Sequence, residues 1–179
     1  MNQKTAMKLF GLLGLLMLLS CGYADRHRNS SSCEQALVDS LEVRVQDSLF
    51  SNVHYSRSQL LEALTQTQDS LVYYRLLALY GKTFFVSSDF DSILYYNRRV
   101  KEFFRNASQS SESLQSPQWN DVLSDVYNIE GNVWMQLNRP DSAITDYKKA
   151  YEYRLKGRKL HLLPDICINT ADAYLHRSD

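Results

Sequence analysis

The sequence predicts an all-α fold made of antiparallel helix pairs. Only 6 Gly and 3 Pro punctuate the 179 residues, too few for a protein of many short strands and tight turns. Apolar residues recur at helical spacing within residues 34–50 and 57–68, as expected for amphipathic helices. The chain also repeats itself: residues 81–100 align without a gap on residues 131–150. The offset between the two copies is about 50 residues, part of which is a Ser-rich insert, and internal repeats of this order indicate stacked structural units.

The first residues have the pattern of an export signal. Lys4 and Lys8 precede the apolar run 9–19, which is shorter than the roughly 20 residues of a membrane-spanning helix. Residues 1–20 are therefore predicted to be a signal peptide. The stretch Leu-Leu-Ser-Cys-Gly at 18–22 resembles the lipobox of bacterial lipoproteins.

This resemblance implies acylation of Cys21 and anchoring of the protein in a membrane through its acyl chains. The implied location is the cell envelope of a Gram-negative-type bacterium, with the protein facing the periplasm. Two alternatives remain, an ordinary cleaved signal with a coincidental Cys21 and an uncleaved anchor.

Residues 21–33 are polar and predict a flexible tether. Once Cys21 is acylated, Cys33 and Cys167 have one possible intramolecular pairing. Two unpaired thiols are the favoured interpretation, because Cys167 falls on a helix face where a small buried residue is expected.

The internal repeat has an ordered set of matching positions. In the alignment of the chain with itself, Gly81 matches Gly131 and Phe84 matches Trp134. Further along, the Asp-Ser pair at 91–92 matches the one at 141–142. A Ser-rich insert at 106–118 is predicted to form a loop between the copies. A third, partial copy includes residues 168–179, where Ala171 matches Gly131.

Residues 124–150 resemble a tetratricopeptide repeat (TPR). First-helix signature positions are filled by Tyr127, Gly131 and Trp134, and those of the second helix by Ala143, Tyr147 and Ala150. The chain departs from the pattern at Glu130, where Leu is usual, and at Leu155, where Pro is usual. The copy at 74–100 is more degenerate: Leu77, Gly81 and Phe84 fit, but Ile93, Asn97 and Val100 do not.

The resemblance implies a short right-handed α-solenoid. Residues 34–68 are expected to form an N-terminal helical pair, and residues 69–179 a TPR-like region. The expected copies lie near 74–105 and 124–157, with a partial copy at 164–179. That partial copy contains a first helix without a second, so it is either a cap or a fragment, and fragment is the favoured interpretation.

The repeat has a physical explanation. Small residues at 81, 131 and 171 let paired helices approach closely. Residues 138–140 predict a turn, after which Asp141 or Ser142 is placed to cap the next helix. Gly157 is a plausible end for that helix.

The residue patterns argue against most chemical functions. Lys plus Arg and Asp plus Glu balance at 20 each, which does not favour nucleic-acid binding. The 4 His residues lack zinc-site spacing, and no phosphate loop, nucleophile elbow or kinase signature occurs. We therefore expect no enzyme, no metal, no cofactor and no small-molecule substrate. Basic clusters at 98–105 and 154–159 are interpreted as complementing the ends of second helices.

The TPR resemblance implies a concave groove that binds a protein or peptide, lined by first-helix residues. The implied groove positions are Arg75, Ala78, Lys82, Phe85, Asp125, Asn128, Asn132, Met135, Asp165, Ile168, Asp172 and Leu175. The favoured function is a lipid-anchored scaffold. The alternative is the exported sensory region of a longer signalling protein, with a histidine kinase or a transcriptional regulator downstream.

Five serines follow an Asp and precede an apolar residue. This pattern is similar to an O-glycosylation acceptor of exported proteins in some Gram-negative bacteria, but helix capping is a competing interpretation. The five are Ser40, Ser48, Ser70, Ser92 and Ser142.

Overall fold

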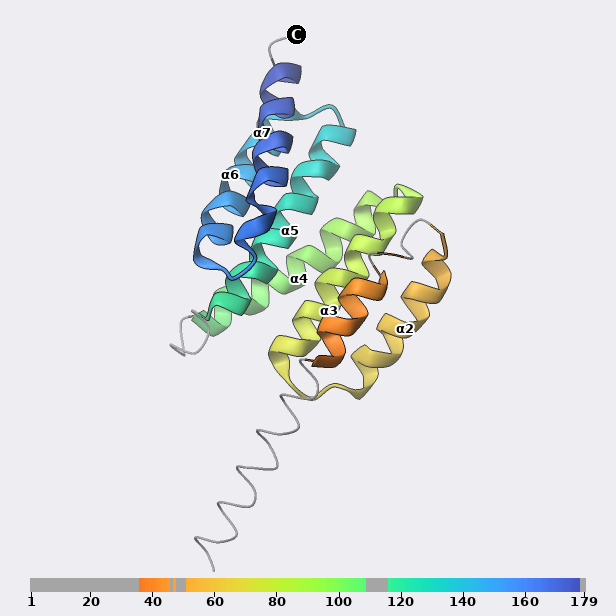
Figure 1. The fold of residues 1–179 in the computed structure, drawn as a ribbon. Coiled ribbons are helices and arrows are strands. Elements are labelled where there is room, and N and C mark those ends of the chain that lie inside the picture. The colour runs from red at the N-terminus through yellow and green to blue at the C-terminus, as the bar shows by residue number, and fades with distance from the viewer. Residues whose placement is uncertain (1–35, 46, 48–50, 109–115, 178–179) are drawn as a thin grey trace, which may run out of the picture. The chain divides into compact units, whose positions relative to one another are not determined.

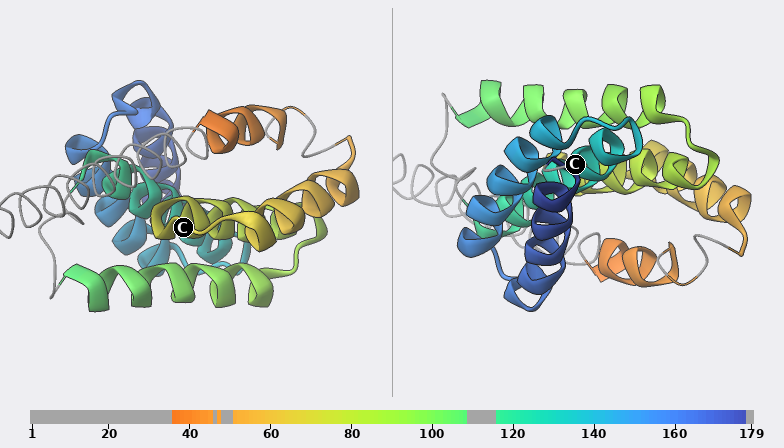
Figure 2. Two further views of the ribbon diagram at one scale, coloured as in Figure 1. Left: turned by 90° about the horizontal axis from the view of Figure 1, so that it is seen from below. Right: turned by 90° about the horizontal axis from the view of Figure 1, so that it is seen from above.

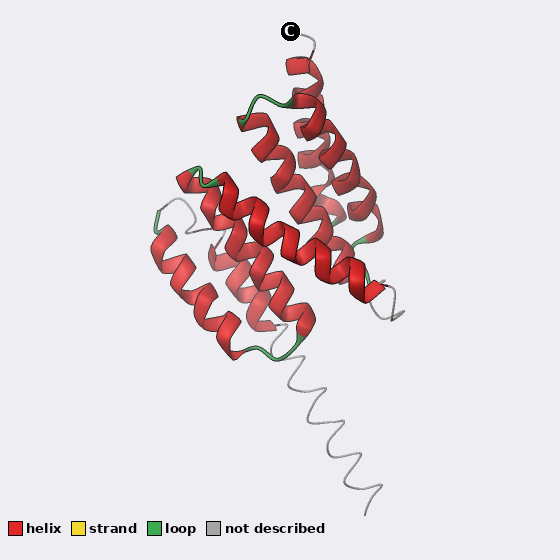
Figure 3. Cartoon of the chain, turned by 180° about the vertical axis from the view of Figure 1, so that it is seen from behind, coloured by secondary structure: helices red, strands yellow, loops and turns green. Residues whose placement is uncertain are grey.

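The computed structural model describes residues 36–45, 47, 51–108 and 116–177. This part of the chain is helical and contains no strand (Figure 3), which confirms the all-α prediction. Cys21, Cys33 and Ser48 lie outside the described residues. No helix in the described part has the length and hydrophobicity needed to cross a bilayer.

Figure 1 labels the longer described helices in chain order. Residues 36–45 are helical; this stretch falls across the boundary of two compact units, residues 1–40 and 41–179. The second unit contains α2 (Val53–Gln66), α3 (Ser70–Lys82), the 3-10 helix η1 (Thr83–Ser87), α4 (Phe90–Ser108), α5 (Pro117–Gln136), α6 (Pro140–Lys156), the 3-10 helix η3 (Leu160–Leu162) and α7 (Leu163–Arg177).

Helices α5 and α6 form the most extensive antiparallel pair. The Ser124 hydroxyl donates to the Ala150 carbonyl at 2.8 Å, and the Trp134 indole donates to Asp146 at 2.8 Å. An early residue of α5 thus contacts a late residue of α6 and the reverse, so the two helices run antiparallel. Helix α7 then packs against α6, and Figure 2 shows α5, α6 and α7 side by side.

The aligned glycines mark the closest approaches between paired helices. A Cβ built on Gly131 would lie within 2.8 Å of three ring carbons of Tyr147 on α6. One built on Gly81 would lie 2.9 Å from the Cβ of Tyr96 on α4. Real Cβ atoms do not approach this closely, so the expectation that small residues at 81 and 131 bring the helices together is confirmed.

Apolar residues at the predicted positions form the core between α5, α6 and α7. Ala143 and Ala150 are fully buried, and Tyr147 is buried against them. Ile166 and Ala173 of α7 complete this cluster. A second cluster around Trp119 joins α3, α4 and α5.

Two expectations about α7 are wrong. Cys167 is a free, exposed cysteine and Ala171 is exposed, although both were expected on a buried face. In α5, the Gly131 position is covered by Tyr147 of the following helix. Among the described residues no helix follows α7, so the equivalent face of α7 is uncovered.

The helix caps also differ from those expected. Asp69 caps α3 by accepting from the N–H groups of Leu71 and Val72. Asp89, just before α4, accepts from the N–H of Ser92. For α6 the N-cap is Arg139, with no side-chain cap bond, so the prediction that Asp141 or Ser142 caps this helix is wrong. Pro140 is already the first residue of α6, and this places both side chains too far along the helix to serve as its N-cap.

Candidate functional site

The predicted groove residues of α5 take part in a hydrogen-bond group with α7. The Asn169 amide donates to the side-chain oxygen of Asn128 at 3.2 Å and to that of Asn132 at 3.4 Å. The Tyr147 hydroxyl also donates to the Asn132 oxygen, at 2.7 Å. Burial raises the pKa of Tyr147 above its usual range, and the nearby charge of Asp172 adds to this. The hydroxyl therefore stays protonated as a donor.

Asp125 is an ion-pair partner of the α6 residue Arg154. Arg154 is only 2% exposed and contacts both Asp125 and Asp121, whose Oδ1 lies 3.1 Å from its Nη1. Asp121 also accepts from the main-chain N–H groups of Arg158 and Lys159 at 3.1 Å. This carboxylate thus joins the start of α5 to the chain that follows α6.

The sequence pattern predicts that Arg154 is one of the cations at the end of its helix, and the structure instead places it in a buried ion pair. A signal was available, because Arg154 continues the buried stripe Ala143, Tyr147 and Ala150 at helical spacing. A cation on an apolar stripe needs a buried partner. Asp121 and Asp125, one turn apart on α5, provide it.

The predicted groove residue Arg75 of α3 binds a carboxylate from the chain's own N-terminal part. Its Nη2 lies 3.1 Å from Oε2 of Glu42, and the other oxygen of Glu42 contacts Nζ of Lys159. Burial alone would raise the pKa of Glu42, but Lys159 and Arg75 together hold it below its usual value. Glu42 is therefore ionised at neutral pH and bridges segments that are distant in sequence.

The remaining groove positions divide between packed and exposed residues. Phe85 lies in η1 and packs against the cluster of Ile93, Ile129 and Val133, and Met135 packs against the α6–α7 core. Lys82 is the last residue of α3 and is half-buried. Exposed positions are found on α7, namely Asp165, Ile168, Asp172 and Leu175.

A second buried charge lies between α4 and α5. Glu130 is 3% exposed and accepts from Nζ of Lys101 at 2.6 Å. Its burial raises its pKa, which Lys101 opposes and the charge of Asp146 reinforces. A charged side chain therefore occupies a buried position of α5.

Glu130→Leu is expected to raise the free energy of unfolding at pH 8 by roughly 1–2 kcal/mol, because burial penalises the charged form of Glu130 more than Lys101 stabilises it. The side chain of Lys101 is 29% exposed, so water can replace its lost partner. The folded-state pKa of Glu130 is raised. The native state therefore gains stability relative to the variant as pH falls through that pKa. Thermal melts should show a smaller gain at pH 4 than at pH 8. A gain that grows on acidification would contradict this assignment.

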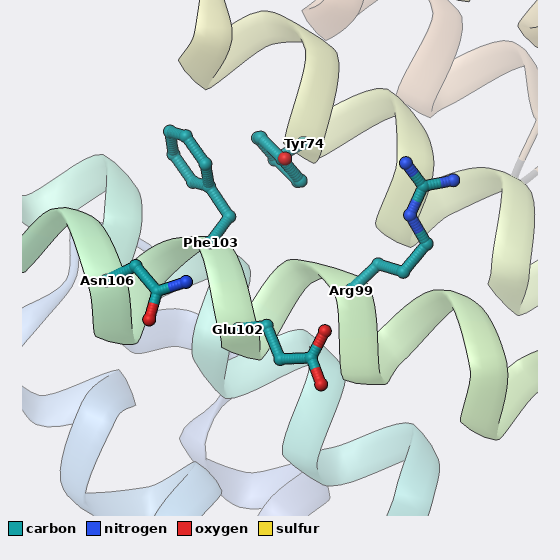
Figure 4. Close-up of a pocket in the computed structure, with 5 residues that line it drawn as sticks. All are labelled: Tyr74, Arg99, Glu102, Phe103 and Asn106. Carbon is teal, nitrogen blue, oxygen red and sulfur yellow. The ribbon is translucent and has the colours of Figure 1, made fainter.

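An open pocket of about 450 Å³ lies at the junction of α3 and α4, outside the predicted groove. In Figure 4, Tyr74 and Phe103 stand together on one side, and their rings stack with centroids 3.9 Å apart. Arg99, Glu102 and Asn106 line the rest. Burial raises the pKa of Tyr74, and the charge of Arg99 opposes this shift.

The candidate modification serines have different surroundings. Ser40, Ser70 and Ser142 are exposed. The Ser92 hydroxyl donates to Asp89 at 2.7 Å, so it already takes part in the start of α4. His54, His161 and His176 are exposed, and no cluster of possible metal ligands occurs among the described residues.

Comparisons with protein-family models, with curated proteins and with solved structures found no match.

Proposed function

We propose that this protein is an exported, lipid-anchored TPR scaffold that binds a protein or peptide segment on the surface lined by α3, α5 and α7. The observation that carries the proposal is the pair of aligned glycines, Gly81 and Gly131. Each lies against the second helix of its own pair. Two helix pairs built in the same way support a repeat, and stacked repeats present their first helices along one surface.

The exposed side chains of α7 support the same conclusion. Ile168 and Leu175 are 66% and 68% exposed, two turns apart on one helix face. Asp165 and Asp172 lie beside them and are also exposed. Apolar contacts flanked by charges are suited to a protein segment, because apolar burial supplies affinity and charges select the partner.

Site-specific photo-crosslinking in the cell envelope tests the surface. A benzophenone side chain in place of Ile168 is expected to give a defined adduct that is lost when Asp165→Lys and Asp172→Lys are added. The matched control is the same group in place of Tyr95, which is 52% exposed on α4. Identical adducts from the two positions would rule out this surface as the binding site.

The lipid anchor has a separate test. Cys21→Ser is expected to abolish metabolic labelling of the protein with radioactive palmitate, because the sulfur and the new amino terminus of Cys21 carry the acyl chains. Cys33→Ser is the matched control and should label as the wild type does. Labelling that survives Cys21→Ser would refute the lipoprotein assignment.

A further inference from the structure

The carboxylate of Glu42 is held between two cations of the folded unit. Arg75 donates to one oxygen at 3.1 Å, and Lys159 contacts the other. The side chains of Arg75 and Lys159 are 9% and 26% exposed. Two cations converging on one carboxylate, from α3 and from the segment before α7, form an anion-binding arrangement.

The main chain at Lys159 is held by a hydrogen bond to a buried carboxylate. Its main-chain N–H donates to Asp121 at 3.1 Å, and Asp121 is paired with the buried Arg154. The neighbouring N–H of Arg158 donates to both oxygens of the same carboxylate. The main chain at Lys159 is therefore held in place by the buried ion pair of Asp121 and Arg154, and this limits where the Lys159 side chain can reach.

The segment that fills this site shows which chemistry the site accepts. Leu41 and Val45, one turn apart, are 4% and 3% exposed, with Glu42 next to Leu41. Val43, on another side of the same turn, is 62% exposed. The occupant therefore presents a carboxylate beside two apolar side chains on one helix face.

We infer that Arg75 and Lys159 form a carboxylate-binding subsite of the groove, which Glu42 fills in the absence of a partner. This inference rests on the proposed function. It adds that the partner is a helical protein segment with Glu or Asp beside apolar residues, and that it binds by displacing residues 41–45.

The energetics allow such an exchange. The side chains of Glu42 and Lys159 are 28% and 26% exposed, so water can replace this contact as the segment leaves. The contact with Arg75, whose side chain is only 9% exposed, is the one that holds the segment in place. Residues 41–45 still compete strongly with an external segment, because they belong to the same chain as the site and so have an effective concentration on the order of millimolar. A substitution that weakens the binding of residues 41–45 should therefore raise the apparent affinity for an external segment. The increase is proportional to the fraction of molecules in which the site is empty.

The test uses the full chain in mild detergent and a fluorescent peptide with the sequence of residues 36–47. Anisotropy titrations compare the wild type with Glu42→Gln, and the peptide with a copy carrying Gln at position 42. We expect the Glu peptide to bind Glu42→Gln at least about tenfold more tightly than the wild type. The Gln peptide should lose most of this gain, because it cannot pair with Arg75 and Lys159.

A charge exchange provides the control. Lys159→Glu in the Glu42→Gln background should reject the Glu peptide and prefer a peptide with Lys at position 42. Equal affinity of wild type and Glu42→Gln, or of the Glu and Gln peptides, would overturn the inference. Crosslinking at Ile168 separates the two proposals: an adduct unchanged by Glu42→Gln leaves the scaffold standing without this subsite.

Discussion

Arg154→Met is expected to lower the free energy of unfolding by about 3–5 kcal/mol, the cost of removing one partner from a buried ion pair. The Arg154 side chain is 2% exposed and that of Asp121 is 6% exposed. Without the guanidinium, Asp121 keeps its two main-chain donors but has no buried counter-charge. Asp125 is 43% exposed, so water can replace its lost partner. The loss should therefore come mainly from Asp121 and fall toward the lower end of this range.

Urea unfolding of the full chain measures this effect. The matched control is Arg158→Ala. That side chain is 56% exposed, and its Nε lies 4.0 Å from Asp121, so a change within about 0.5 kcal/mol is expected. Adding Asp121→Asn to Arg154→Met should cost less than the sum of the two single changes, since the uncompensated charge is then absent. Strict additivity would show that the two side chains are not coupled.

Arg154→Lys sharpens the same test. A lysine has one compact ammonium in place of a planar guanidinium fork, so it cannot contact Asp121 and Asp125 with two separate nitrogens. A stability close to that of the wild type would mean that charge alone matters at this position. A clear loss of stability would show that the separate contacts of the two guanidinium nitrogens with Asp121 and Asp125 matter.

The helices and the close approaches at the two glycines were predictable because they follow from local patterns. Helical spacing of apolar residues and aligned small residues depend on neighbours within a few turns, so Gly81 and Gly131 were placed correctly. The helix starts were harder to place. Asp89 and Asp91 lie two residues apart at the start of α4. Asp89 precedes the helix and accepts from the N–H of Ser92, whereas Asp91 already lies in the first turn.

The ion pairs depend on contacts between segments distant in sequence. Glu42 and Lys159 meet only after the intervening helices have folded, and neither residue breaks the local pattern. Arg154 and Glu130 are different, because each places a charge on an otherwise apolar stripe. Such residues signal a buried partner, although the sequence alone does not say which residue it is. The candidate groove stays a prediction, and the contacts already made by Arg75, Asp125 and Asn132 could not be predicted from the sequence.

Gly131→Leu is expected to lower the free energy of unfolding by about 2–3 kcal/mol, because overpacking a close helix contact forces side chains and backbone to move. The ring of Tyr147 has little room to shift. It is 2% exposed, and its hydroxyl is bonded to Asn132. Glu152→Leu, on the exposed side of α6, is the matched control and should change stability by no more than about 0.5 kcal/mol.

For the smaller substitution Gly131→Ala, the sign of the change in unfolding free energy tests the contact. In the wild type, the new methyl group meets the Tyr147 ring, and overpacking outweighs the gain of about 1 kcal/mol in helix propensity. In a Tyr147→Ala background the ring is absent, so the same Gly131→Ala change should stabilise the protein. Thermal melts of the four proteins form a double-mutant cycle. If Gly131→Ala has the same sign in both backgrounds, the contact between α5 and α6 at Gly131 is not the reason for the glycine.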